Sequence, residues 1–294
     1  MATNLGTGPT QGWGGSGNPR PAIDIRNFAL QMTDYRLQPD PALVATRLPG
    51  QVISAITELR QHPRGPRERQ SLFGDELTIL GEFGPWSYVQ LTKDNYCGYM
   101  QSTAIGPQTP ATHCVSARAT HAYSQPDFKS ADRSSLSFAS RITVQDETAR
   151  FAKTSLGYIP LQHLTLLTET SSAPAAIAHV FLGTPYLWGG NSSWGIDCSG
   201  LVQAALLACD MSCPPDSDQQ KSQLGTSCPS GSEYVRNDLL FWKGHVALIT
   251  SADMLIHANV HHMAVTYEPI DDAVHRIART DGPVTAHKRL RISK

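Results

Sequence analysis

The stretch Thr184-Pro-Tyr-Leu-Trp-Gly-Gly-Asn-Ser-Ser-Trp-Gly-Ile-Asp-Cys-Ser-Gly-Leu-Val-Gln203 joins a glycine-rich loop to an apolar run with the composition and length of a helix. Cys198 would open that helix. Unpaired backbone N–H groups and the helix dipole at this end favour a thiolate, which is the nucleophilic form of cysteine. Most cysteines are small core residues, but a cysteine that only packs would gain nothing from this position. The pattern therefore favours a nucleophile at Cys198.

Two histidines further along the chain supply the groups that a nucleophilic thiol needs. His245 begins one apolar run and His257 lies near the end of the next, with Ser251-Ala252-Asp253 between them as a hairpin turn. A turn centred on Ser251 places the two histidines directly opposite each other, on one face of an antiparallel pair. One imidazole could then act as the base while the other fixes its tautomer. The sequence thus predicts a catalytic set of Cys198, His245 and His257.

An ordered series of motifs around these residues resembles the NlpC family of papain-like cysteine peptidases, which cleave bacterial cell-wall peptides. The matching motifs are Pro185-Tyr186-x-Trp188-Gly189-Gly190, Gly195-x-Asp197-Cys198-Ser199-Gly200-Leu201-Val202, Asp238-Leu239-x-Phe241 before His245-Val246, and His257-Ala258.

The resemblance covers about residues 175–294. It implies that Cys198 is the nucleophile, His245 the base and His257 the orienting third residue. It also implies that the Tyr186 hydroxyl helps to stabilise the oxyanion, although a packed aromatic at a loop corner is an alternative. By the same resemblance, neither a metal nor an organic cofactor is required.

Composition limits the classes of protein to which the chain can belong. Of its 294 residues, 40% are hydrophobic and 17% charged, and the formal charge of −1 gives no electrostatic reason to expect nucleic acid or an anionic membrane as a partner. The first 21 residues lack the basic and apolar regions of a signal peptide. One free catalytic thiol among six cysteines leaves an odd number, which disfavours a disulfide framework. A cytoplasmic protein is expected.

The expected fold class is multidomain, with two small SH3-like all-β barrels followed by an α+β papain-like catalytic domain. We expect an N-terminal arm or strap at 1–50, barrels at 51–106 and 107–170, and the peptidase domain at 171–294. In the arm, Asp40 and Pro41 are expected to begin a short helix.

The barrels are expected from short β segments separated by glycine and proline turns. The expected strands are Val52–Thr57, Glu76–Leu80, Trp86–Leu91 and Tyr96–Met100, then Val115–Arg118, Arg141–Val144, Ala149–Lys153 and Gly157–Pro160. The first set resembles a bacterial SH3-like domain at Gly74-Asp-Glu and at Tyr96-x-Gly98-Tyr99. His62 to Gln70, rich in arginine, is expected to be a solvated loop.

The same resemblance implies a pocket for a free α-amino group. Its candidates are Asp197 and Ser199 beside the cysteine, Tyr96 with an acidic residue (Glu68 or Glu58) from the first barrel, and Asp216, Ser217 and Asp218 after the cysteine helix. Asp197 could equally serve as the helix N-cap, and both roles are compatible. A carboxylate there would raise the pKa of the thiol, and a substrate ammonium would relieve the repulsion.

Such a pocket suits murein-derived peptides of the form L-Ala-γ-D-Glu-diamino acid, cleaved at the γ-D-glutamyl bond during cell-wall recycling. Three alternatives stay open: a secreted hydrolase of intact peptidoglycan with wall-binding barrels, a non-catalytic peptidoglycan-binding protein, and an acyltransferase or amidase. The sequence leaves the oligomeric state and the third substrate residue undetermined.

Overall fold

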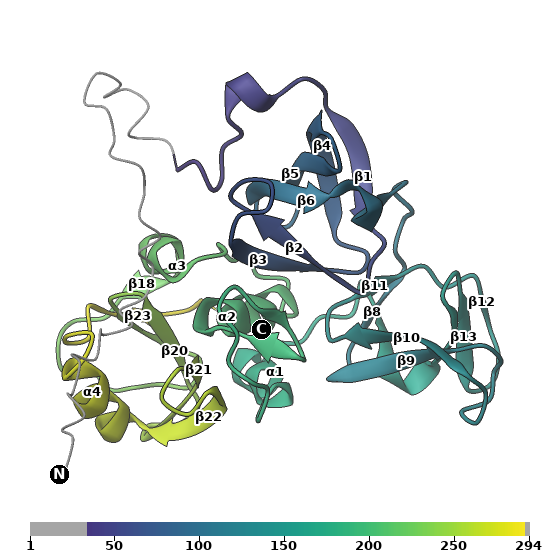
Figure 1. Cartoon of the computed structure of the whole chain (residues 1–294). Coiled ribbons are helices and arrows are strands. Elements are labelled where there is room, and N and C mark those ends of the chain that lie inside the picture. The colour runs from purple at the N-terminus through teal and green to yellow at the C-terminus, as the bar shows by residue number, and fades with distance from the viewer. Residues whose placement is uncertain (1–33, 292–294) are drawn as a thin grey trace, which may run out of the picture.

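The computed structural model describes residues 34–291, which form two β-rich regions and one α+β region (Figure 1). Residues 1–33 of the expected arm lie outside the described residues. In the part that is described, the 3-10 helix η3 (Pro41–Leu43) is capped by the Asp40 side chain, which accepts a hydrogen bond from the Ala42 N–H. The expected cap and first-position proline are therefore present, but the helix is a single turn because a strand follows at Leu48.

The first β-rich region is an antiparallel seven-stranded sheet with the order β3-β2-β6-β5-β4-β1-β7. Its elements are β1 (Leu48–Val52), β2 (Ile56–Arg60), β3 (Arg67–Leu72), β4 (Glu76–Phe83), β5 (Trp86–Leu91), β6 (Cys97–Gln101), η4 (Ser102–Ala104) and β7 (Ile105–Gly106). Apolar side chains from most of these strands, including the fully buried Val52, Leu59 and Val89, form its core.

Two expectations for this region are wrong. The expected strand at 52–57 is broken between β1 and β2, and the end of the expected loop at 62–70 is the strand β3. β3 carries arginine and glutamate and yet is inward-facing, since Arg69 is only 1% exposed. Two of the arginines that suggested a solvated loop, Arg67 and Arg69, instead donate hydrogen bonds to the carbonyl groups of Trp188 and Pro215.

The second β-rich region consists of two sheets, with the orders β10-β9-β14-β13-β12 and β11-β8-β15. Its elements are β8 (His113–Val115), β9 (Ala119–Tyr123), β10 (Asp132–Ser137), β11 (Arg141–Ile142), β12 (Asp146–Glu147), β13 (Phe151–Thr154), β14 (Gly157–Pro160), η5 (Leu161–His163) and β15 (Leu164–Leu166). The expected strands correspond in part to β8, β11, β13 and β14. β9 and β10 were not expected, because their buried positions are mostly alanine, threonine and serine. That this region is a second SH3-like barrel stays a prediction.

The α+β region is built on an antiparallel six-stranded sheet with the order β18-β23-β19-β20-β21-β22. The strands of this sheet are β18 (Thr226–Ser227), β19 (Leu239–Trp242), β20 (His245–Ile249), β21 (Met254–Asn259), β22 (Ala264–Pro269) and β23 (Ala286–Arg289). A separate two-stranded sheet is formed by β16 (Asn191–Ser192) and β17 (Gly195–Ile196). The helices of the region are α1 (Pro174–Val180), α2 (Cys198–Leu207), α3 (Ser217–Gln223) and α4 (Ile270–Ala278).

Helices cover both faces of the six-stranded sheet. Val246, Leu248 and Ile256 pack with α1 and α2, whereas Ala247 and Leu255 pack with α4. Because successive residues of a strand point to opposite faces, α2 and α4 lie on opposite sides (Figure 1). All helices within residues 34–291 fall short of the length and apolar character that a membrane span requires.

Both β-rich regions contact the loop that precedes Cys198. From the first region, the Gln70 N–H donates to the Gly189 carbonyl over 2.8 Å, and Gly189 lies so close that an added Cβ would sit 2.4 Å from the Glu68 carbonyl oxygen. From the second, Ser137 Oγ lies 3.1 Å from Ser193 Oγ. The loop is therefore held from two sides.

Candidate active site

Cys198 is the first residue of α2, as expected from the sequence. Asp197 is the N-cap, and its Oδ1 accepts from the Gly200 N–H over 2.7 Å. The cysteine is 7% exposed. Its sulfur lies 4.0 Å from the Gly244 carbonyl oxygen and accepts from the Val246 N–H. The nucleophile candidate thus rests against the backbone on both sides of His245.

The charge state of Cys198 differs from the expected thiolate. Burial, followed by the Asp197 carboxylate, raises the pKa of the thiol to about 12, and the N–H groups of Val246, Ser199 and Cys198 offset this only in part. Desolvation disfavours a charge more strongly than the helix end favours it. The cysteine is therefore a neutral thiol at physiological pH in the free protein.

His245 and His257 meet as the sequence predicts, with His245 Nε2 2.9 Å from His257 Nδ1. They are not directly opposite, because Leu248 pairs with Ile256 and Ile249 with Leu255, so the turn is centred one residue later than expected. That register makes the two histidines diagonal neighbours on one face. The two rings are still in contact, because an imidazole side chain is long enough to reach a diagonal neighbour on the adjacent strand.

A short turn fixes the start of β20. Trp242 pairs with His245 across a two-residue connection, and Gly244 has a φ of 72°. A side chain at position 244 would be strained in this left-handed conformation. The turn places the half-buried His245 ring 5.6 Å from the Trp242 ring, centroid to centroid.

Within residues 34–291, no hydrogen bond joins the Cys198 sulfur to a ring nitrogen of His245. Burial, followed by His257, holds the pKa of His245 well below its ordinary value, so its imidazole is neutral. A nucleophilic thiol that is neutral at rest requires general-base activation, in which a base takes the proton as the sulfur attacks. Catalytic hydrogen bonds of this kind often tighten only when substrate is bound.

The hydrogen-bond chain continues beyond the predicted set. His257 is 0% exposed, and its Nε2 lies 3.0 Å from Glu268 Oε2. Arg276 in turn donates to both oxygens of Glu268, over 2.9 and 2.6 Å. Sequence reasoning missed Glu268 and Arg276, because only the pairing of β21 with β22 brings Glu268 beside His257.

Tyr186 lies close enough to Cys198 and Asp197 for their charges to act on its hydroxyl. Burial, with smaller contributions from Cys198 and Asp197, raises the pKa of the Tyr186 hydroxyl. It therefore stays protonated and can donate a hydrogen bond to a developing oxyanion. Its backbone is anchored by a bridge to Ile196 and by donation to the Met263 carbonyl.

The candidates for amine binding lie around the loop contact. Asp197 Oδ1 accepts from Ser199 Oγ as well as from the helix, and its Oδ2 accepts from the Gly189 N–H over 2.9 Å. A carboxylate offers about four lone-pair positions, so one acceptor position remains. Burial raises the pKa of Asp197, while Arg69 and these donors act in the opposite direction.

The first β-rich region contributes the other two candidates. The Tyr96 hydroxyl donates to Glu68 Oε2 over 3.3 Å. Glu58, the alternative to Glu68, is instead paired with Arg60 and Arg67, over 2.6 and 2.9 Å. Of the two acidic candidates, Glu68 is the one that contacts Tyr96.

The candidates after the cysteine helix have another partner. Arg36 forms ion pairs with Asp216 at 2.7 Å and with Asp218 at 2.8 Å. Ser217, between them, is the first residue of α3. These carboxylates therefore hold the segment around Arg36 against the α+β region.

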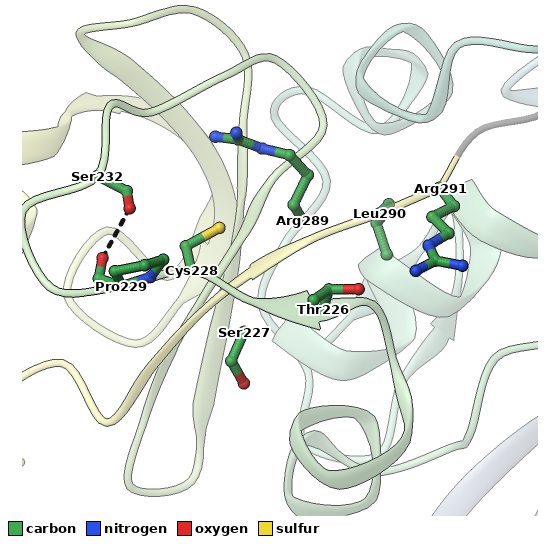
Figure 2. A pocket seen from close by; sticks show the side chains of 8 residues that line it. All are labelled: Thr226, Ser227, Cys228, Pro229, Ser232, Arg289, Leu290 and Arg291. Carbon is green, nitrogen blue, oxygen red and sulfur yellow. Dashed lines mark hydrogen bonds between the residues drawn. The ribbon is translucent and has the colours of Figure 1, made fainter.

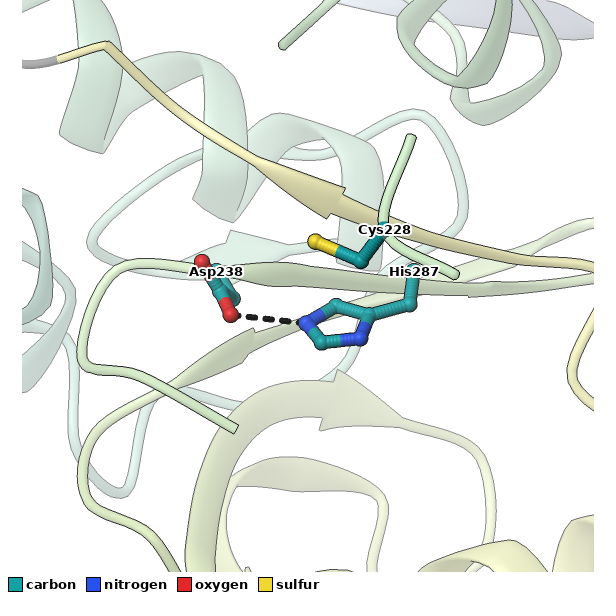
Figure 3. Close-up of side chains that lie close together, drawn as sticks. All are labelled: Cys228, Asp238 and His287. Carbon is teal, nitrogen blue, oxygen red and sulfur yellow. Dashed lines mark hydrogen bonds and ion pairs between the residues drawn. The ribbon is translucent and has the colours of Figure 1, made fainter. Parts of the chain in front are cut away.

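Two clusters in the described chain have side chains of metal-binding type. They are Cys228, Asp238 and His287 (Figure 3), and His257, His262 and Glu268. In each, an arginine already neutralises the carboxylate, Arg289 on Asp238 and Arg276 on Glu268. A cation would face that guanidinium, so neither cluster fits a metal ion.

A surface hollow of about 410 Å³ is lined by β18, by residues that follow it and by the end of β23 with the residues after it (Figure 2). Its lining includes Cys228, Ser232 and Arg289, and none of its residues belongs to the Cys198 site. All six cysteines are free thiols.

A cysteine at a helix N-terminus, packed on an antiparallel sheet that carries a histidine pair, is the arrangement that a thiol hydrolase requires. Residues 183–278 match the NlpC/P60 family, and residues 59–105 match the bacterial dipeptidyl-peptidase Sh3 domain. The chain thus contains an NlpC/P60 domain and a bacterial dipeptidyl-peptidase SH3 domain, which confirms the family expected from the motifs.

Similar proteins support this assignment. The chain is 26% identical over 240 residues to dipeptidyl-peptidase 6 of Lysinibacillus sphaericus, covering 71% of this chain and 86% of that protein. It is 37% identical over 86 residues to the gamma-D-glutamyl-L-lysine dipeptidyl-peptidase of Bacillus subtilis, covering 26% of this chain and 28% of that protein. The crystal structure of an NlpC/P60 family protein from Bacillus cereus has the same fold, with a TM-score of 0.70 and 18% identity over 83% of this chain and 99% of that one.

Proposed function

We propose that the protein is a cysteine peptidase that hydrolyses the γ-D-glutamyl to diamino acid bond of murein peptides with a free N-terminal L-alanine. The observation that carries the proposal is the contact of Glu68 with the loop before the cysteine. Gly189 touches the Glu68 backbone and donates to Asp197, which caps the Cys198 helix. The Glu68 backbone and the Asp197 carboxylate thus both contact Gly189, which brings the strand that carries Glu68 to the loop beside the nucleophile. The names of the similar dipeptidyl-peptidases agree with this substrate class.

The proposed reaction begins when the Cys198 thiol passes its proton to His245 Nδ1 and the sulfur attacks the γ-carbonyl carbon. The oxyanion accepts hydrogen bonds from the Cys198 N–H and the Tyr186 hydroxyl. His245 then gives its proton to the departing amine nitrogen, and a thioester forms. Water, losing a proton to the same His245, attacks the thioester and regenerates the thiol.

The amine pocket sets specificity in this proposal. An ammonium beside Asp197 neutralises the charge that opposes ionisation of Cys198, so correct binding also activates the nucleophile. An acylated N-terminus provides no positive charge and leaves the buried carboxylate unpaired. Peptides blocked at the N-terminus should therefore be poor substrates.

Free and N-acetylated L-Ala-γ-D-Glu-diaminopimelate provide the test. We expect L-Ala-D-Glu and diaminopimelate from the free peptide, and a rate at least about 100-fold lower for the acetylated one. Mass spectrometry of the products measures both rates. Equal cleavage of the two peptides, together with release of peptides from sacculi, would instead support a hydrolase of the intact wall.

Asp197→Asn should have opposite effects on two reactions of the same thiol. Loss of the carboxylate lowers the pKa of Cys198, so alkylation by iodoacetamide at pH 8 should become about 3- to 10-fold faster. Hydrolysis of the free peptide should fall by roughly 10- to 100-fold, because the ammonium loses its partner. Asparagine retains the helix cap.

The pH dependence of alkylation is the control for this prediction. Because the pKa of Cys198 is raised to about 12, alkylation of the wild-type protein should keep rising with pH through pH 10 without a plateau. A plateau near pH 7, or slower alkylation of the variant, would contradict the role given to Asp197.

A further inference from the structure

Four side chains from four successive elements form one line of contacts behind Cys198. They are His245 on β20, His257 on β21, Glu268 on β22 and Arg276 on α4. The links are 2.9 Å between the imidazoles, 3.0 Å from His257 to Glu268, and 2.6 Å from Arg276 to Glu268. His257 and Glu268 are buried, at 0% and 7% exposure. Water is therefore excluded from the middle of the line.

The chemistry of Glu268 determines the direction of these hydrogen bonds. An ionised carboxylate only accepts, so the proton between Glu268 and His257 lies on His257 Nε2. A neutral imidazole with a proton on Nε2 presents a lone pair at Nδ1. His257 Nδ1 then accepts from His245 Nε2, which leaves the lone pair of His245 on its Nδ1.

Arg276 has two effects on the line. Its two hydrogen bonds help to hold the pKa of Glu268 well below the ordinary value, so the carboxylate stays ionised. Its positive charge also opposes protonation of His257, whose pKa is lowered by burial, Arg276 and His262, against the opposing effect of Glu268. Glu268 without Arg276 would favour an imidazolium at His257, with a proton on Nδ1.

We propose that Glu268 and Arg276 are positioning residues that set the direction of the hydrogen-bond chain, so that His245 offers an unprotonated Nδ1 to the thiol. This inference rests on the proposed function of Cys198 as nucleophile. The ion pair acts through two imidazoles and touches neither the cysteine nor the substrate.

The variant Glu268→Leu removes the acceptor that sets the direction. Gln is less suitable, because Glu268 Oε2 accepts from both His257 and Arg276 and an amide oxygen in its place would keep both bonds. Without an acceptor, a proton on His257 Nε2 is buried and unpaired, so it is better placed on Nδ1, where it is donated to His245 Nε2. His245 then carries its proton on Nδ1, the nitrogen that should receive one. We expect kcat to fall by roughly 10- to 100-fold with KM changed by less than about twofold, since the substrate pocket is untouched.

The variant Arg276→Met has a different signature. Unpaired Glu268 attracts a proton to His257, so the acidic limb of kcat/KM should move to higher pH by about one unit. The groups that face His257 are His245 from β20, Glu268 from β22, Arg276 from α4 and His262 from the turn after β21. His262, Glu268 and His245 are unchanged in this variant, so the shift reports the loss of the arginine charge.

The chain contains a matched control in the Asp238 cluster (Figure 3). Asp238, just before β19, accepts from His287 Nε2 over 2.7 Å. It also accepts from Arg289 over 2.9 Å, which gives the same combination of histidine, carboxylate and arginine. Asp238→Leu should lower the melting temperature as much as Glu268→Leu does, while leaving kcat and its pH profile within about twofold of the wild type. A fall in kcat equal to that of Glu268→Leu would mean that loosening the sheet, not reversing the chain, causes the loss.

Nitrogen-15 NMR of histidine-labelled protein reads the tautomers directly, without a substrate. In the wild type we expect protons on Nε2 of both His245 and His257, and in Glu268→Leu protons on Nδ1 of both. A wild-type His245 protonated on Nδ1, or tautomers unchanged in the variant, would overturn the inference. Because this readout needs no turnover, it stays decisive even if the peptidase assignment fails or the variant is unstable, since the wild-type spectrum alone can contradict it.

Discussion

Cys198→Ala is expected to lower kcat/KM by at least about 10⁴-fold, because removal of the nucleophile from a cooperative catalytic set leaves only binding and oxyanion stabilisation. The sulfur is the one group in the proposed reaction that forms a covalent bond with the substrate. The change should leave the fold intact, since the side chain is small and its hydrogen bonds are with backbone groups. Product release from L-Ala-γ-D-Glu-diaminopimelate measures the loss, and the melting temperature checks the fold.

Cys228→Ala is the matched control for this substitution. Cys228 is a free, partly exposed thiol that also lies beside a histidine and a carboxylate, His287 and Asp238 (Figure 3). It should retain full activity. Residual hydrolysis by Cys198→Ala above about one per cent of the wild-type rate would remove Cys198 from the role of nucleophile.

Arg69→Ala is expected to be the most destabilising single change, at about 3–5 kcal/mol. Arg69 is 1% exposed and donates to the Pro215 carbonyl over 3.0 Å and to the Gln203 side chain. It also lies 3.6 Å from Asp94 and 3.8 Å from Asp216. Its removal leaves buried acceptors without a donor and a cavity between the SH3 domain and the catalytic domain.

Thermal unfolding measures this loss, and the melting temperature should fall by about 10 °C. Arg60→Ala is the control, because Arg60 lies on the neighbouring strand and pairs with Glu58 at a side-chain exposure of 31%. Such a partly exposed pair contributes at most about 1 kcal/mol. Equal melting temperatures for the two variants would show that Arg69 does not hold the domains together.

The parts of the site that sequence predicted are those encoded locally. The helix that begins at Cys198 follows from its apolar run, and the contact of His245 with His257 follows from the spacing of a hairpin. Moving the turn centre by one residue changes the strand register by two residues, and because side chains alternate with a period of two, the two histidines keep a shared face.

The parts that sequence did not predict depend on contacts between distant elements. Arg69 resembled a solvated charge because its partner Gln203 is 134 positions away. Glu268 had no motif, since its role depends on the register of β22 and on Arg276 of the following helix. The resting charge of Cys198 depends on burial, which no local pattern reports.

The loop before Cys198 is contacted by Gln70 on one side and by Ser137 on the other. These two contacts matter for inhibitor discovery. A fragment trimmed to residues 171–294 would lose both contacts with this loop. Compounds selected against such a fragment would meet a loop without its two supports, so screening campaigns should include residues 34–170 as well.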